Sequence, residues 1–200
     1  MSDFNVCYNW MMDNEDRLRA CRSVADTVSP KLDASMTPEQ RQAEIERAKN
    51  AKAISGCNSY FHPDAFAKIA AVPPAQRQPL VQQFYKEQFW NRWYESLDSD
   101  EVGKRVFDEG VNAGPGIAVK ILQQAVNASI APSAPRIAVD GKWGPQTIST
   151  VNSLTEGYLV IEFKRLRLAH YQNIVLRYPD KAVYLGTADH PGPWWVRAIQ

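Results

Sequence analysis

A glutamate near the start of this 200-residue chain has the surroundings that acid catalysis requires. Residues 4–19 show helical spacing, and Glu15 lies toward the end of this segment. The apolar face of the predicted helix carries four side chains: Phe4, Tyr8, Met11 and Met12. Cleavage of a glycosidic bond needs a carboxylic acid that stays protonated near neutral pH, and an apolar wall favours that form. Glu15 is therefore the candidate general acid, while the run "DNEDR" around it would equally suit a solvated helix end.

Aromatic side chains would be the natural lining of a saccharide groove, because sugar rings present apolar faces to them. Tyr60, Trp90 and Trp93 are the candidates for such a lining, with Tyr94 beside them. Aromatic rings at helical spacing are also typical of a packed core, so both interpretations stay open.

Several other catalytic motifs are missing from the sequence. It contains no glycine-rich phosphate loop, no His-Glu-x-x-His zinc helix and no Gly-x-Ser-x-Gly nucleophile elbow. His62, His170 and His190 lie far apart and at no metal-ligand spacing, so we expect no metal and no cofactor. His170 falls on an apolar helical face, which favours a place in the core. A thiol nucleophile, Cys21 or Cys57 paired with His62, is a further alternative without local support.

Charge and cysteine content narrow the class of protein. The formal charge is +1, with basic and acidic side chains nearly balanced, which argues against a nucleic-acid binder. The three cysteines, Cys7, Cys21 and Cys57, match neither a disulfide framework nor a zinc site. We expect free and mostly buried thiols in a reducing compartment. No basic segment followed by an apolar run opens the chain, and no apolar segment approaches the roughly 20 residues that span a bilayer.

The elements that would position these residues are helices. Thr37 as N-cap, Pro38 at the first helical position and Gln40 closing a capping box predict an exposed, charged helix over residues 37–54. From residue 75 to 97 an apolar side chain recurs every fourth position, which predicts one long helix. Further helices are predicted over residues 63–71, 99–112 and 117–127, from about 145, and over 158–176. Because no run alternates with period two, the predicted fold class is all-α.

The second half of the chain carries several spaced elements of one known family. An Asp-x-x-Val-Asn-x-Gly stretch precedes a Leu-Gln helix and then an Asp-Gly-x-x-Gly-Pro-x-Thr stretch. The matching residues are Asp108, Val111, Asn112, Gly114, Leu122, Gln123, Asp140, Gly141, Gly144, Pro145 and Thr147. In this order they resemble glycoside hydrolase family 108, whose second half is described as a helical peptidoglycan-binding-like domain.

The first half is similar to the same family more loosely. The interval from Phe4 to Glu15 is that between a Phe and the Glu of the family's His-Glu-Gly-Gly-Tyr motif. Phe61-His62-Pro63 resembles a later Phe-His-Pro stretch. The segments "FYKEQFW", "FKRLRLAHYQ" and "WWVRA" also look like parts of the family pattern.

The resemblance implies a lysozyme-like helical fold and a muramidase whose catalytic acid is Glu15. It also adds His62 and Asn112 to Tyr60, Trp90 and Trp93 as expected substrate-binding residues.

Two departures from the family pattern concern the active site. Asp16 and Arg17 replace the two glycines of the motif, and a longer insertion over about residues 20–52 replaces an Asp-Pro-Gly-Gly-x-Thr stretch. The second polar group of the site therefore stays open among three residues: Asp26, Asp33 and Ser55.

We expect two closely packed helical lobes, a catalytic one over residues 1–98 and a peptidoglycan-binding-like one over 99–200. The expected function is hydrolysis of the β-1,4 bond between N-acetylmuramic acid and N-acetylglucosamine in peptidoglycan, by a monomer without membrane insertion. Such a protein would stay in the cytoplasm until its release to the cell wall, as a phage-encoded endolysin or a virion-associated lysozyme. The alternative is a catalytically decayed peptidoglycan-binding or phage structural module.

Overall fold

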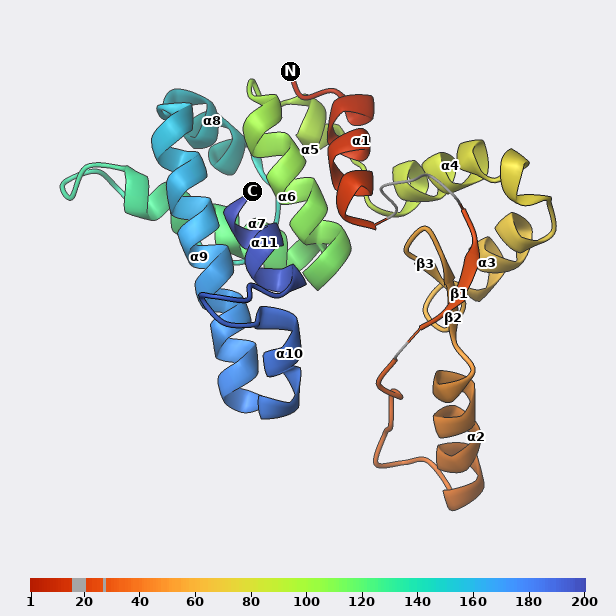
Figure 1. Cartoon of the computed structure of the whole chain (residues 1–200). Helices are drawn as coiled ribbons and strands as arrows, with labels where there is room; N and C mark the ends of the chain where they lie inside the picture. The colour runs from red at the N-terminus through yellow and green to blue at the C-terminus, as the bar shows by residue number, and fades with distance from the viewer. Residues whose placement is uncertain (16–20, 27) are drawn as a thin grey trace. The chain divides into compact units, whose positions relative to one another are not determined.

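The computed structural model of the chain is predominantly helical, as predicted, with one small β-sheet that the sequence did not predict (Figure 1). The structure describes residues 1–15, 21–26 and 28–200. Its α-helices are α1 (Phe4–Glu15), α2 (Pro38–Lys49), α3 (Pro63–Ala70), α4 (Gln78–Gln88), α5 (Arg92–Glu95), α6 (Asp100–Ala113), α7 (Pro115–Ser129), α8 (Pro145–Ser153), α9 (Glu156–Arg177), α10 (Ala182–Leu185) and α11 (Pro193–Ile199). Short 3-10 helices are η1 (Pro74–Gln76) and η2 (Pro179–Lys181).

The chain divides into two compact units. One combines Met1–Met11 with Phe89–Gln200, and the other is Met12–Gln88. These bounds differ from a division at residue 98, while the functional division into a catalytic lobe and a binding lobe stays a prediction. None of the helices among the described residues is long and apolar enough to span a bilayer.

Helix α1 begins at a side-chain cap and ends at the candidate acid. Asp3 Oδ1 accepts hydrogen bonds from the backbone N–H groups of Asn5 at 2.8 Å and Val6 at 3.1 Å, so two donors at the helix start are satisfied. The four apolar side chains predicted for its inner face are all buried: Phe4, Tyr8, Met11 and Met12. Glu15 continues that spacing, three residues after Met12. Residues 16–20, which were expected to extend this helix, lie outside the described residues.

A three-stranded antiparallel sheet belongs to the unit Met12–Gln88. Strand β1 (Ser23–Ala25) pairs with β2 (Lys52–Ile54), and β2 pairs with β3 (Cys57–Asn58). Strands of two or three residues are too short to show alternation, which is why the sequence did not reveal them.

Helix α2 begins as predicted and ends earlier. The capping box is present, because Thr37 Oγ1 accepts from the Gln40 N–H at 3.2 Å and the Gln40 side chain accepts from the Thr37 N–H at 2.8 Å. The prediction of helix through residue 54 is wrong after Lys49. Asn50 closes the helix by donating from its side chain to the Glu46 carbonyl at 2.9 Å, and the chain then enters β2.

The apolar stripe over residues 75–97 does not form one helix, so this prediction is wrong. Asn91 interrupts it, because its side chain accepts a hydrogen bond from the Trp93 N–H at 3.0 Å and caps α5 as a new helix. The stripe is divided between the units: Tyr85 is buried in one and Leu97 in the other. A regular spacing across the break therefore reflects two separate buried faces.

Helices α6 and α9 hold a buried ion cluster in the larger unit. Arg167 Nη2 donates to Asp108 and its Nε donates to Glu109 Oε2 at 2.6 Å. Tyr171 donates to the same Glu109 oxygen at 2.6 Å. Burial raises the pKa of Glu109, and the guanidinium of Arg167 opposes part of that shift. Arg167 Nη1 also donates to the Arg197 carbonyl at 2.9 Å, so the cluster holds α11 against α9.

Candidate functional site

The candidate site centres on the hairpin turn between β2 and β3. Ser55 and Gly56 form the turn, with φ values of 47° and 80°. Positive φ at both central residues is what a two-residue type I′ turn requires, and it matches the twist of the flanking strands. Ser55 is buried and Gly56 is exposed, so the turn presents Gly56 at the surface of its unit.

Glu15 and Tyr85 converge on Gly56. A Cβ atom at residue 56 would lie 2.2 Å from Tyr85 Oη and 2.9 Å from Glu15 Oε2, so the two oxygens are within about 5 Å of one another. Only a residue without a side chain leaves room for both groups at this turn. Tyr85 is buried and donates a hydrogen bond to the Ser55 carbonyl at 2.8 Å, whereas Glu15 is half-buried. The site is therefore a carboxylic acid at the end of an apolar helix face, with a fixed phenol hydroxyl beside it.

A second set of contacts connects the turn with the segment before β1 and with the start of α4. Ser55 Oγ donates to Cys21 Sγ at 3.4 Å, and Cys21 Sγ donates to Gln78 Oε1 at 3.3 Å. Cys21 itself has a φ of 47°, and its carbonyl accepts from Arg77 Nη1 at 2.8 Å. Arg77 also donates from Nε to the Val72 carbonyl at 2.9 Å, so one guanidinium ties the segment before β1 to the chain after α3. Gln78 of helix α4 and Arg77 thus help to fix the position of the turn next to Tyr85.

The three candidates for the second polar group differ in their distance from the turn, and of the three only Ser55 lies at it. Asp26 lies at the opposite end of the sheet: its N–H donates to the Ala51 carbonyl at 3.0 Å, and its carboxylate accepts from the Asn58 side chain at 2.5 Å. At about 3.3 Å per strand residue, Ala51 is roughly 13 Å along β2 from the turn. Asp33 lies in the connection before α2, where hydrogen bonds from the Ser35 hydroxyl and N–H lower its pKa.

Tyr60 and His62 occupy packed positions in the same unit. Tyr60 is buried, donates its hydroxyl proton to Glu44, and lies under the Arg47 guanidinium at 4.4 Å from the ring centroid. His62 is half-buried with its ring 4.9 Å from that of Phe84, and burial lowers its pKa. This packing favours a structural role for Tyr60 and leaves His62 partly accessible.

The other expected substrate-binding residues belong to the larger unit. Trp90 is stacked on Tyr94 at 4.8 Å and contacts Phe107 edge-on at 5.6 Å, so it is part of an aromatic core. Trp93 is half-buried with the Arg92 guanidinium 4.9 Å from its ring centroid.

Asn112 uses both ends of its amide in the neighbourhood of the ion cluster. It donates to Tyr171 Oη at 2.8 Å and accepts from Arg197 Nη1 at 2.7 Å. This arrangement favours a structural role for Asn112 over a role in binding sugar.

The thiols are poorly suited to nucleophilic catalysis. All three are free and buried, as expected from the sequence: Cys7, Cys21 and Cys57. Burial raises the pKa of Cys57 to about 12, so the thiolate is scarce at neutral pH. Cys21 donates to an amide oxygen, which does not act as a base.

Sequence reasoning missed Gly56 and Tyr85 as parts of the site. The Ser-Gly dipeptide is a turn signal that would have pointed to a hairpin if the short strands on either side had been recognised. Tyr85 belongs to an apolar stripe and to the segment "FYKEQFW" that resembles the family pattern, and neither feature gives information about the place of its hydroxyl group.

No family model and no curated protein matches the sequence. Among solved structures, the chain is similar to SagA from Brucella abortus, with a TM-score of 0.50 and 17% sequence identity. The likeness covers 90% of this chain and 86% of that one. It therefore concerns the fold over nearly the whole of both chains.

Proposed function

We propose that the chain is a peptidoglycan hydrolase that cleaves the β-1,4 bond between N-acetylmuramic acid and N-acetylglucosamine. The observation that carries the proposal is the place of Glu15, half-buried at the end of the face formed by Met11 and Met12, with its carboxylate against the turn at Gly56. The spaced elements from Asp108 to Thr147, which resemble those of glycoside hydrolase family 108, support the substrate class.

In this proposal Glu15 donates its proton to the glycosidic oxygen as the bond to the anomeric carbon breaks. A water molecule adds its oxygen to that carbon and gives up a proton, and the carboxylic acid is restored from solvent. No metal or organic cofactor takes part.

The group beside Glu15 determines the expected stereochemistry. The described group beside Glu15 is the neutral Tyr85 hydroxyl, which directs its proton to the Ser55 carbonyl, whereas the buried Ser55 hydroxyl donates to Cys21 Sγ. Neutral groups suit the orientation of a water molecule, whereas a retaining enzyme would use a second carboxylate about 5–5.5 Å away as nucleophile. We therefore expect inversion at the anomeric carbon.

The alternative is a module that binds peptidoglycan without cutting it, or a phage structural part. Two observations favour this alternative: Tyr60 and Trp90 are packed instead of lining a groove, and Asp16 and Arg17 replace the glycines of the family motif.

The product of digestion tests the proposal. Purified peptidoglycan would be incubated with the protein, reduced with borohydride and analysed by mass spectrometry. Cleavage of the proposed bond leaves N-acetylmuramic acid at each new reducing end, so the reduced products should carry the muramic alcohol. Products ending in reduced N-acetylglucosamine would assign another bond, and binding without new ends would favour the module.

A further inference from the structure

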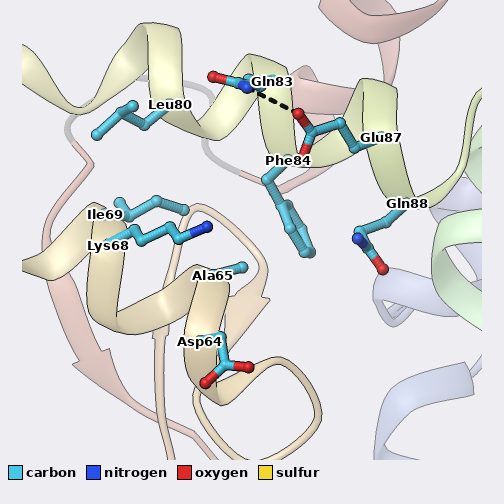
Figure 2. Close-up of a pocket in the computed structure, with 9 residues that line it drawn as sticks. All are labelled: Asp64, Ala65, Lys68, Ile69, Leu80, Gln83, Phe84, Glu87 and Gln88. Carbon is cyan, nitrogen blue, oxygen red and sulfur yellow. Dashed lines mark hydrogen bonds between the residues drawn. The ribbon is translucent and has the colours of Figure 1, made fainter.

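A pocket of about 240 Å³ lies between α3 and α4, within the unit Met12–Gln88 (Figure 2). Its apolar floor consists of Ile69, Leu80 and Phe84. Its rim is polar and comprises Asp64 and Lys68 from α3 and Gln83, Glu87 and Gln88 from α4. The pocket therefore combines an apolar base with charges of both signs.

Two of the charged rim groups, Asp64 and Lys68, have no polar partner among the residues that the structure describes. Asp64 and Lys68 have the i, i+4 spacing of a helical ion pair, yet neither makes an ion pair or hydrogen bond to any described residue. Figure 2 shows Lys68 extending into the space between the two helices and Asp64 pointing away from it. On α4, Gln83 donates to Glu87 Oε1 at 2.7 Å, so that carboxylate is held along the helix (Figure 2).

Helix α4 connects this pocket with the candidate acid. Phe84 forms part of the pocket floor, and its ring centroid lies 5.0 Å from that of Tyr85, the next residue, whose hydroxyl lies at the Glu15 turn. Consecutive residues of a helix project about 100° apart, so Phe84 and Tyr85 place the pocket and the turn at neighbouring faces of α4. A branched substrate would have its glycan at the turn and its side branch in the pocket.

We propose that the pocket between α3 and α4 binds the peptide branch of peptidoglycan, so this inference rests on the proposed function. Such a peptide carries carboxylates and, on its diamino residue, an ammonium group next to small apolar side chains. Lys68 would bind a carboxylate, Glu87 would bind the ammonium, and the methyl and methylene groups would cover Phe84 and Leu80.

Binding of a synthetic peptide tests this pocket without requiring catalysis. The probe is an N-acetylated tetrapeptide with one lysine and a free carboxyl terminus, titrated into the full chain by isothermal calorimetry or NMR. We expect Lys68→Met and Glu87→Gln each to weaken binding about three- to fivefold, the scale of a partly exposed ion pair. The matched controls Lys49→Met and Glu46→Gln, on exposed α2, should bind like the original chain. Equal affinity in all five proteins, or no binding by the original chain, would overturn the inference.

Hydrolysis of two substrates separates this inference from the proposed function. Lys68→Met should raise KM several-fold on peptide-bearing peptidoglycan and leave it unchanged on glycan strands freed of peptide. Equal kinetics on both substrates would refute the pocket and keep the hydrolase. Peptide binding without any new reducing ends would keep the pocket and refute the hydrolase.

Discussion

At the scale of single residues, both the backbone conformation of the turn and the proposed chemistry depend on the absence of a side chain at Gly56. The Ser55-Gly56 turn needs positive φ, and the space above Gly56 holds Glu15 Oε2 and Tyr85 Oη. Substitution Gly56→Ala should therefore reduce both stability and turnover. The backbone conformation alone costs about 1–2 kcal/mol for an L-residue, and the added Cβ pushes both oxygens away.

Denaturant unfolding and peptidoglycan digestion of Gly56→Ala test this expectation. Gly157→Ala is the control, since that glycine has ordinary φ and nothing within 4 Å of an added Cβ. If Gly56→Ala behaves like Gly157→Ala in both assays, the close approach of Glu15 to the turn is wrong.

Substitution of Tyr85 tests the hydrogen bond that fixes the turn. Tyr85→Phe removes the donor to the buried Ser55 carbonyl, and we expect a loss of about 1–3 kcal/mol in unfolding free energy. Turnover should fall by at least about tenfold, because the turn no longer has a fixed position beside Glu15. Tyr178→Phe, at an exposed tyrosine, is the control. If Tyr85→Phe keeps full activity but has a lower unfolding free energy, the role of Tyr85 is structural only.

His62 gives the protein a pH-dependent stability. Burial and the nearby Lys31 ammonium lower its pKa below the ordinary value of about 6.5, so the folded protein favours the neutral ring. The unfolded chain then takes up a proton more readily than the folded one as pH falls through about 6.5. The unfolding free energy should therefore be fully present above that pH and decrease as pH falls toward the lowered folded-state pKa.

Urea unfolding at about pH 7.5 and 5.5 measures this effect. The loss of stability on acidification should be smaller in His62→Gln than in the original chain, and unaltered in His190→Gln, where the histidine is exposed. The same loss in all three proteins would assign the pH dependence to other groups.

At the scale of elements, α9 shows what helical spacing predicts and what it does not. It predicts the helix, but it does not predict every buried position. Helical spacing predicts one apolar face through Leu159, Phe163, Leu166, His170 and Ile174. The first two side chains are buried, whereas the last three are half-buried. The fully buried positions after Phe163 are Arg167 and Tyr171, one residue further along. Periodicity counts apolar residues, so it cannot reveal an arginine that is buried because Asp108 and Glu109 neutralise it.

Arg167 and Arg165 form a matched pair of substitutions on α9. Arg167→Met should cost about 3–5 kcal/mol in unfolding free energy, because it leaves the buried carboxylate of Glu109 without a cation and that of Asp108 with Arg197 alone. Arg165→Met removes only an exposed pair with Glu162 and should change stability by about 0.5 kcal/mol or less. Comparable losses in the two variants, measured by denaturant unfolding, would contradict the central place of the cluster.

Local signals predicted helix starts well and some helix ends poorly. The Thr37 capping box is present, and the helices predicted over residues 99–112 and 117–127 correspond to α6 and α7. The ends of α2 and α4 were missed, because Asn50 and Asn91 act through side-chain hydrogen bonds that depend on the local fold.

At the scale of the whole molecule, the helical fold was predictable and its division into units was not. Helical periodicity is a local property, whereas the grouping of Met1–Met11 with Phe89–Gln200 depends on contacts between segments distant in sequence, such as the Ser2 N–H donating to the Leu97 carbonyl at 2.7 Å. The same holds for the site. Glu15 was identified from its helix, but its partner turn required a β-hairpin formed by residues that show no strand pattern.

The most direct test of the central claim is the rate at which new reducing ends form in purified peptidoglycan, for the original chain and for Glu15→Gln. A general acid contributes about a hundred- to ten-thousandfold to the rate, so we predict a loss of at least about a hundredfold with unfolding behaviour and peptidoglycan binding preserved. The control Glu39→Gln, on the exposed helix α2, should retain full activity. Undiminished formation of reducing ends by Glu15→Gln would contradict the assignment of Glu15 as the catalytic acid.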